Sequence, residues 1–299
     1  MKVVIFYEQT EKKTSEAIER IISAHSCAVI CHQTDEIWNA AKYTNPPALL
    51  QDITHILLIF GERGIDDPAF IFFSGMGIGK NLPVLILKQK AEHRLPDNCK
   101  NLAVPLTVDT FEDYFIKEQK NFLAIERKRA ARMELLNLGY PCFDVNFIGA
   151  VKEGQTGAVQ LFLDAGFDAS LRDTRGTPVL SLAVRESQYD TAVLLLSYGA
   201  EINLCAEDRS YSALMEAAQL GDLRTAHLLL SKNADTNIQS KDGQTALILA
   251  VGRQDIPMVK LLIENNADWT ITDHLGMSAL GYAKLFNNKE IIALMQNPL

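Results

Sequence analysis

No stretch of this chain reaches the ~18 consecutive apolar residues that a membrane-spanning helix requires, which excludes such a helix. The apolar segment at its start, Met1–Glu8, is too short for a secretory signal, so we expect none. The five cysteines are odd in number and scattered, which argues against a disulfide framework and favours a reducing, cytoplasmic location. The six histidines form no cluster, so we expect no metal site.

Positive charge is scarce in the second half of the chain. The formal net charge is −8, and it is unevenly distributed. Residues 1–140 carry 17 Lys and Arg against 18 Asp and Glu, whereas residues 141–299 carry 12 against 19. An acidic surface repels phosphates, so we expect neither nucleic acid nor an anionic membrane as a partner of this half.

A short block recurs four times in the acidic half. It reads LLLSYGA at 194–200, LLLSKNA at 228–234 and LLIENNA at 261–267, with a looser copy, LFLDAGF, at 161–167. One Gly or Asn position of the block recurs at steps of 33, 34 and 33 residues. This period predicts a solenoid of stacked helical units, and solenoids usually present a binding surface.

Each unit of this repeat predicts two short helices and a hairpin that leads to the next unit. A hydroxyl residue such as Thr245 begins the first helix by accepting a free backbone N–H. The second helix carries the Leu-rich stripe and ends at Gly199 or Asn233, residue types that tolerate left-handed backbone. The single step of 34 places an extra residue in 203–210, so we expect that hairpin to be longer than the others.

The blocks GQTALILA at 243–250 and NNAD at 265–268 resemble the ankyrin repeat, and the resemblance covers residues 140–299 as five units. It implies an all-α solenoid that binds a protein. The Thr-Pro-Leu-His box of the family is incomplete here. Its His position holds Ser181, Met215, Ile248 and Gly281.

Ankyrin arrays usually bind partners through their hairpin tips and the exposed side of the first helices, on the concave face. Tyr211 beside Arg209 is the best anchor candidate, because Tyr and Arg dominate binding hot spots. For any single position, an ordinary solvated residue is the alternative. The matching positions are Arg175, Arg209, Tyr211, Gln219, Lys241, Asp242, Gln244, Arg253, His274 and Met277.

The first 110 residues alternate apolar segments with helical ones. Strands that are apolar throughout predict a parallel sheet covered on both faces, which binds ligands beyond the carboxyl ends of its strands. We expect strands at 2–7, 27–31, 54–60, 82–88 and 102–108, and helices at 14–24, 48–52 and 67–77.

A long helix is predicted at 111–138, so the chain divides into a domain at 1–110, a bridging helix at 111–139 and repeats at 140–299. The basic run of this helix, Arg127–Arg132, is either a solvated face, a partner of the acidic repeats or a contact for nucleic acid or lipid. The apolar residues of the helix suit packing between the two halves. They are Phe115, Phe122, Ile125, Met133 and Leu136.

Three segments of the first domain, 54–63, 67–84 and 102–115, resemble TIR-like domains, and the middle one is also similar to nucleoside deoxyribosyltransferase-like domains of flavodoxin-like fold. Catalytic members of both families place a Glu two residues before a helix Gly, where it acts on an N-glycosidic bond. Gly75 matches that Gly, and the Glu position holds Phe73, which cannot serve as a base. The resemblance therefore implies a non-catalytic domain.

Two alternatives stay open for this domain: an enzyme that cleaves the N-glycosidic bond of NAD or a nucleoside with Glu62 or a pocket Asp, or a nucleotide sensor. The ligand-binding candidates are Tyr7, Glu8, Glu62 and Asp66. Together, the sequence predicts a flavodoxin/TIR-like α/β domain followed by an ankyrin solenoid. We expect a cytoplasmic protein-interaction module with a signalling or scaffold role and no cofactor. Self-association through the α/β domain is a further hypothesis.

Overall fold

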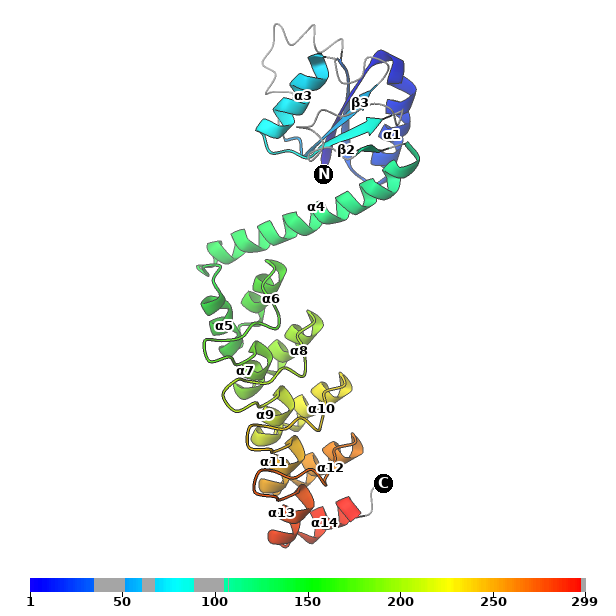
Figure 1. Cartoon of the computed structure of the whole chain (residues 1–299). Helices are drawn as coiled ribbons and strands as arrows, with labels where there is room; N and C mark the ends of the chain where they lie inside the picture. Colours follow the sequence, from blue (N-terminus) through cyan, green and yellow to red (C-terminus); the bar gives the residue numbers. More distant parts are fainter. Residues whose placement is uncertain (35–51, 61–67, 89–104, 107, 297–299) are drawn as a thin grey trace. The chain divides into compact units, whose positions relative to one another are not determined.

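The computed structural model describes residues 1–34, 52–60, 68–88, 105–106 and 108–296 (Figure 1). They belong to two compact units, Met1–Glu126 and Arg127–Leu299. The elements described in the first unit are β1 (Lys2–Tyr7), a short 3-10 helix (Gln9–Glu11), α1 (Lys12–Ala24), β2 (Ala28–Gln33), β3 (His55–Phe60), α3 (Pro68–Gly79), β4 (Val84–Lys88), β5 (Pro105–Leu106) and α4 (Val108–Asn137), which continues into the second unit.

The strands of the first unit form one parallel sheet in the order β2-β1-β3-β4-β5. In the register, Val3 lies opposite Val29 on β2 and His55 on β3. Successive residues of a strand point to opposite faces. Val4 and Phe6 therefore pack on the face that α3 covers, and the alternate residues pack on the face that α1 and the start of α4 cover. Both faces are buried, which explains why these strands are apolar throughout.

The start of α4 is attached to the sheet by apolar and polar contacts. Phe111 and Phe115 are fully buried in the core. The ring of the buried His55 lies with Nε2 3.4 Å from the Glu118 carboxylate and Nδ1 3.0 Å from Thr54 Oγ1. Burial lowers the pKa of His55, and Glu118 opposes that shift.

The predicted elements of the first unit are largely confirmed. Strands at 2–7, 27–31, 54–60 and 82–88 and helices at 14–24 and 67–77 are present, with ends that differ by a few residues. The expected short helix at 48–52 lies almost entirely outside the described residues, as does most of the expected strand at 102–108, of which Pro105–Leu106 is described.

The second unit contains five helix pairs stacked in succession over one continuous apolar core (Figure 1). Gly199 and Asn233, just beyond two of the second helices, have φ of 84° and 63°, which confirms the left-handed ends predicted there. The pairs are α5 (Asp144–Lys152) with α6 (Thr156–Asp164), α7 (Val179–Arg185) with α8 (Tyr189–Ser197), α9 (Ala213–Leu220) with α10 (Leu223–Ser231), α11 (Ala246–Gly252) with α12 (Ile256–Glu264) and α13 (Ala279–Leu285) with α14 (Lys289–Gln296).

The end of α4 caps the first helix pair through residues outside the predicted apolar set. Ala131 and Leu135 join the core of the repeats. Ile125, Met133 and Leu136 are exposed by 63%, 55% and 55% and belong to neither core. Their packing between the halves stays a prediction. Residues two positions from Ala131 or one from Leu135 point to other sides of a helix, because each step turns the helix by about 100°.

Candidate functional site

The hairpins between units fix where each first helix begins. Asp273 accepts the backbone N–H groups of Leu275 and Met277 at 3.0 Å each, and Asp173 binds the equivalent groups of its own hairpin. The backbone closes the same turns, with the N–H of Asp273 bonded to the carbonyl of Met277 four residues on. Each hairpin thereby delivers the chain to a first helix in a fixed direction.

The hairpin before α9 is longer, as predicted. The N–H of Ala206 bonds to the carbonyl of Tyr211, five residues on rather than four. Ala206 has no side-chain acceptor to organise the turn, and a bond from the N–H of Ser210 to the carbonyl of Ala206 spans it at 2.8 Å. Ser210 has a φ of 55° at the position where the other hairpins have glycine.

Helix caps then orient the first helices. The side chains of Ser212, Thr245 and Ser278 each accept the N–H of the residue three positions later, which confirms the hydroxyl cap predicted for these units. In α7 the cap position is Pro178, which has no side-chain acceptor. The preceding Thr177 is fully buried, and its Oγ1 finds no partner within the described part of the chain.

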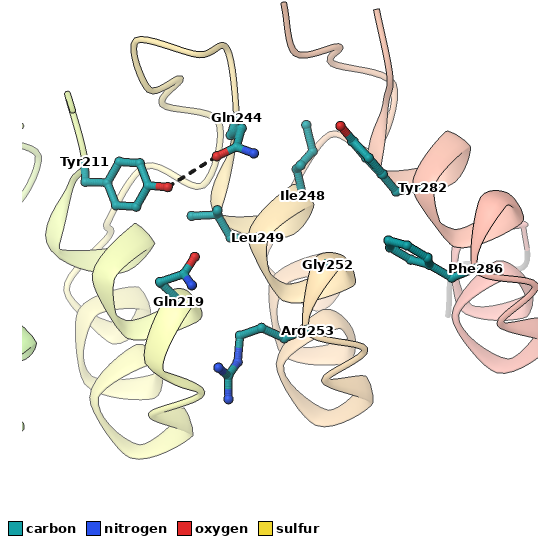
Figure 2. Close-up of a pocket in the computed structure, with 9 residues that line it drawn as sticks. All are labelled: Tyr211, Gln219, Gln244, Ile248, Leu249, Gly252, Arg253, Tyr282 and Phe286. Atoms are coloured by element: carbon teal, nitrogen blue, oxygen red, sulfur yellow. Dashed lines mark hydrogen bonds between the residues drawn. The ribbon is translucent and has the colours of Figure 1, made fainter. Parts of the chain in front are cut away.

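A groove of about 310 Å³ crosses the first helices of three successive units, α9, α11 and α13 (Figure 2). Tyr282 and Phe286 point from α13 toward α11 (Figure 2). The lining is mostly uncharged: Tyr211, Gln219, Gln244, Ile248, Leu249, Gly252, Arg253, Tyr282 and Phe286.

One wall of the groove is made by Tyr211, which is only 7% exposed. Its hydroxyl donates to Gln244 Oε1 of the next unit at 3.2 Å. The guanidinium of Arg209 lies 4.4 Å from the ring centroid and covers one face of the ring. Burial raises the pKa of Tyr211, while Arg209 opposes the shift. Tyr211 is thus a fixed wall of the groove rather than a protruding anchor.

The floor of the groove has a gap at Gly252. The positions equivalent to Gly252 in neighbouring units, seven residues after each cap, hold Arg185, Gln219 and Leu285. A Cβ built on Gly252 meets nothing within 4 Å. The missing side chain therefore leaves open space beside Leu249, between the two walls of the groove.

Arg253 is the charged residue of the lining, and it extends from α11 toward α9 (Figure 2). Within the described part of the chain it forms no ion pair and no side-chain hydrogen bond. The nearby Asp255 caps α12, where its Oδ1 accepts the N–H of Met258 at 3.1 Å. The guanidinium of Arg253 is therefore available to a ligand.

An ion cluster borders the groove on the α7 side. Glu216 Oε1 lies 2.6 Å from Arg185 Nη2 and 3.3 Å from Arg209 Nη2, and the Glu216 side chain is 4% exposed. Although burial opposes it, the bond to Glu216 raises the pKa of Arg185. Two arginines share one carboxylate here, which leaves the cluster with a formal charge of +1.

The α/β unit places Phe73 in its core rather than in a pocket. The Phe73 ring is fully buried and stacks on Phe6, with 3.9 Å between the ring centroids. Tyr7 ends β1, and Glu8 follows it at the carboxyl end of the strand, 6% exposed. Glu62 and Asp66 lie outside the described residues.

The described residues contain neither a metal-binding cluster nor a membrane-spanning helix. No group of three or more His, Cys, Asp or Glu could hold a metal ion there. Nor does any helix in that part of the chain combine the length and the apolar character needed to cross a membrane.

Comparison with known proteins assigns the chain to a family. An ankyrin repeat-containing protein of Treponema pallidum (strain Nichols) is 46% identical over 296 residues, 99% of each chain. The chain belongs to the ankyrin repeat-containing protein family. A family model for ankyrin repeats, in three copies, matches residues 214–297 of this ankyrin protein, which includes the helices that form the groove.

Partial matches connect the ankyrin protein with larger chains. An L-asparaginase of Dirofilaria immitis is 30% identical over 147 residues, 49% of this chain and 25% of that protein. Neurogenic locus notch homolog protein 2 of Homo sapiens is 36% identical over 125 residues, 41% of this chain and 5% of that protein. Because the matches cover only 25% and 5% of these two proteins, the activity of neither protein can be assigned to this chain.

The groove of the ankyrin array brings together four of the ten predicted partner-binding residues: Tyr211, Gln219, Gln244 and Arg253. Arg209 adjoins them through Tyr211. Arg175 lines a separate cavity with Asp173. The remaining candidates, Lys241, Asp242, His274 and Met277, belong to hairpins outside the groove lining.

Sequence reasoning missed the apolar half of the ankyrin groove. Leu249, Gly252, Tyr282 and Phe286 were not among the candidates, although they line it. The available signal was positional. At the repeat position of Gly252, the other units have a residue with a side chain. At the repeat position of Arg253, the last unit has the aromatic residue Phe286.

Proposed function

We propose that the ankyrin array captures a protein partner by seating a segment of it in the groove across α9, α11 and α13. The observation that carries the proposal is the open floor at Gly252, bordered by Leu249 and Phe286, beside an Arg253 without a partner in the described chain. A partly apolar recess with a few fixed polar groups is the usual form of a binding site. Tyr211, held by Gln244 and Arg209, gives the recess a preorganised wall.

For the α/β unit we propose a non-catalytic role in signalling or as a scaffold. The strand order 2-1-3-4-5 is that of flavodoxin-like sheets, which supports the resemblance to TIR-like domains. The buried ring of Phe73, at the position of the Glu of the catalytic relatives, supports the absence of glycosidic-bond cleavage. We place the protein in the cytoplasm, consistent with four described cysteines that are all free thiols.

A partner-capture experiment tests the groove. The tagged full chain and its Gly252→Leu variant are incubated with a lysate of the source cells, and captured proteins are quantified by mass spectrometry. The leucine fills open space on an exposed helix position, so the fold is expected to persist. The control is Gly157→Leu in α6, where a Cβ also meets nothing within 4 Å. Proteins lost from Gly252→Leu but kept by Gly157→Leu support the proposal, and equal capture by all three chains contradicts it.

A second candidate function, a nucleotide sensor or an NAD- or nucleoside-cleaving enzyme, is favoured by the position of Glu8. This buried carboxylate lies at the carboxyl end of β1. In the strand order, β2 lies on one side of β1 and β3 on the other, so the order of the strands reverses direction at β1. Ligands of parallel sheets bind at such a switch point. Calorimetry with NAD and nucleosides tests binding, and chromatography of the same mixtures tests turnover. Turnover that Glu62→Gln abolishes would establish an enzyme, and binding without turnover a sensor.

Self-association through the α/β unit stays a separate hypothesis. Sedimentation of the full chain over a range of concentrations measures it directly. A monomer at all concentrations would remove it.

A further inference from the structure

The charges around the groove differ from those of the array that contains it. Residues 141–299 carry seven more acidic than basic residues, yet no Asp or Glu lines the groove. Its charged lining residue is Arg253, and the adjoining cluster of Arg185, Arg209 and Glu216 adds a formal +1. Acidic residues lie nearby, with Asp255 close to Arg253 and Asp208 and Asp173 acting on Arg185. Within the groove lining itself, however, an incoming segment meets a cation and no carboxylate.

The polar groups of the groove are mostly engaged already. The hydroxyl of Tyr282 donates to Asp273 Oδ2 at 2.6 Å, and the hydroxyl of Tyr211 donates to Gln244. The guanidinium of Arg253 and the exposed side-chain amide of Gln219 form no hydrogen bonds within the described residues, and both can donate. A guanidinium binds a carboxylate with two parallel N–H groups, which makes the carboxylate its best-matched ligand.

The space beside Arg253 selects for shape. The gap over Gly252 is bordered by Leu249 of the same helix and, on the α13 side, by Phe286 and Tyr282 (Figure 2). A water-filled recess between apolar walls gains free energy when a large apolar side chain fills it. The groove thus offers a recess for an aromatic or aliphatic side chain at Gly252, and the next residue, Arg253, supplies a cationic hydrogen-bond donor.

We propose that the ankyrin groove recognises an acidic peptide segment, in which a carboxylate pairs with Arg253 and a neighbouring aromatic or aliphatic side chain fills the space over Gly252. This inference rests on the proposed function, because it names the chemistry of the segment that the groove holds. The partner is thereby a protein with an exposed acidic stretch interrupted by bulky apolar residues.

The test begins with a library of random 12-residue peptides displayed on phage and selected on the full chain. The expected enrichment is for sequences with Asp or Glu beside Phe, Tyr, Trp, Leu or Ile. An enriched peptide is then synthesised with a fluorescent label, and its affinity is measured by anisotropy. We expect Gly252→Leu to abolish its binding and Gly157→Leu to leave it unchanged.

Charge variants separate this inference from the proposed function. Arg253→Glu should weaken the peptide about tenfold or more, as loss of a charge-assisted bond implies. Lys232→Glu, an equal charge change at an exposed site at the end of α10, should have little effect. Replacing Asp and Glu in the peptide by Asn and Gln should reproduce the loss seen with Arg253→Glu.

Each outcome decides between the two claims. Binding that Gly252→Leu abolishes but Arg253→Glu does not change overturns the acidic specificity and leaves the groove as a binding site. Enrichment of neutral or basic peptides does the same. Peptides that tolerate Gly252→Leu, or a selection that yields no binder, count against both the inference and the groove.

Discussion

Phe73 lies face to face with Phe6, with 3.9 Å between the ring centroids and 12° between the ring planes. The contact joins α3 to β1, and neither ring is accessible to solvent beyond 1%. Phe73, at the position where the resemblance to TIR-like domains would place a glutamate, thus serves packing. Phe73 is part of the apolar core between α3 and the sheet.

Replacing Phe73 by Glu should therefore unfold the α/β unit rather than create an enzyme. Truncation of a buried Phe costs about 3–5 kcal/mol, and burial of a carboxylate adds to that cost. Hydrogen exchange read by mass spectrometry should show loss of protection in β1 and β3, while peptides from the repeats keep theirs. Phe73→Leu should lose much less. Retained protection with NAD turnover in Phe73→Glu would contradict this view.

The repeats could be predicted from the period of the sequence, because the residue types at helix ends and caps are set by the local backbone conformation and recur in each unit. Asn233, for example, takes the left-handed conformation that its residue type tolerates. The burial of Tyr211 could not be predicted, because it depends on Gln244 in the next unit and on the fold of a lengthened hairpin that brings Arg209 over the ring. The groove depends in turn on a side chain that is absent at Gly252.

The buried residues of α4 could be predicted only in part from the sequence. That helix changes its packing partner along its length, with Phe111 and Phe115 in the sheet core and Ala131 and Leu135 in the repeat core. A single amphipathic stripe cannot describe a helix that buries one face in the sheet core and another in the repeat core. The apolar residues of the sequence therefore include Met133, which is exposed. Small residues such as Ala131 carry little signal in the sequence, yet they permit close packing.

The lengthened hairpin carries backbone strain at Ser210. Its φ of 55° is costly for a residue with a Cβ, and Gly176, Gly243 and Gly276 occupy the equivalent place with φ between 72° and 79°. We expect Ser210→Gly to stabilise the array by about 0.5–1 kcal/mol, measured by urea denaturation.

Gly243→Ala is the matched opposite of that change. Its Cβ would lie 2.9 Å from the backbone of both Asp273 and His274, so it should destabilise the array by more than Ser210→Gly gains. A loss of stability in Ser210→Gly would contradict the predicted strain and show that the serine hydroxyl stabilises the hairpin.

Asp273 should make the last hairpin sensitive to acid. Its carboxylate is buried, which by itself raises the pKa, but the Tyr282 hydroxyl and the N–H groups of Met277 and Leu275 outweigh burial and lower the pKa. A carboxyl with a lowered folded-state pKa stabilises the fold fully above its ordinary value near 3.8, and this stabilisation is lost as the pH falls below that value.

Urea midpoints measured from pH 7 down to pH 3 should therefore fall more steeply for the native chain than for Asp273→Asn. The variant should also be less stable at neutral pH, because an amide cannot accept three hydrogen bonds as strongly. Asp242→Asn, on an exposed carboxylate of the preceding hairpin, is the control for net charge. Parallel acid profiles of the native chain and Asp273→Asn would rule out this source of the pH dependence.

Thr177 and Thr245 are both buried, but their hydroxyl groups are in opposite situations. Thr245 accepts the N–H of Ile248 through its Oγ1 at 3.3 Å and caps α11, whereas Thr177 precedes the capping Pro178 and its Oγ1 has no partner in the described chain.

An unsatisfied buried hydroxyl costs about 1–3 kcal/mol, and valine has nearly the same shape as threonine without that hydroxyl. Thr177→Val should stabilise the array by about 1 kcal/mol, because the backbone bonds of Thr177 to Asp173 are kept. Thr245→Val should destabilise it by about 0.5–2 kcal/mol through loss of the cap. Urea denaturation followed by circular dichroism measures both, and a change of the same sign in the two variants would mean that the Thr177 hydroxyl is satisfied in solution.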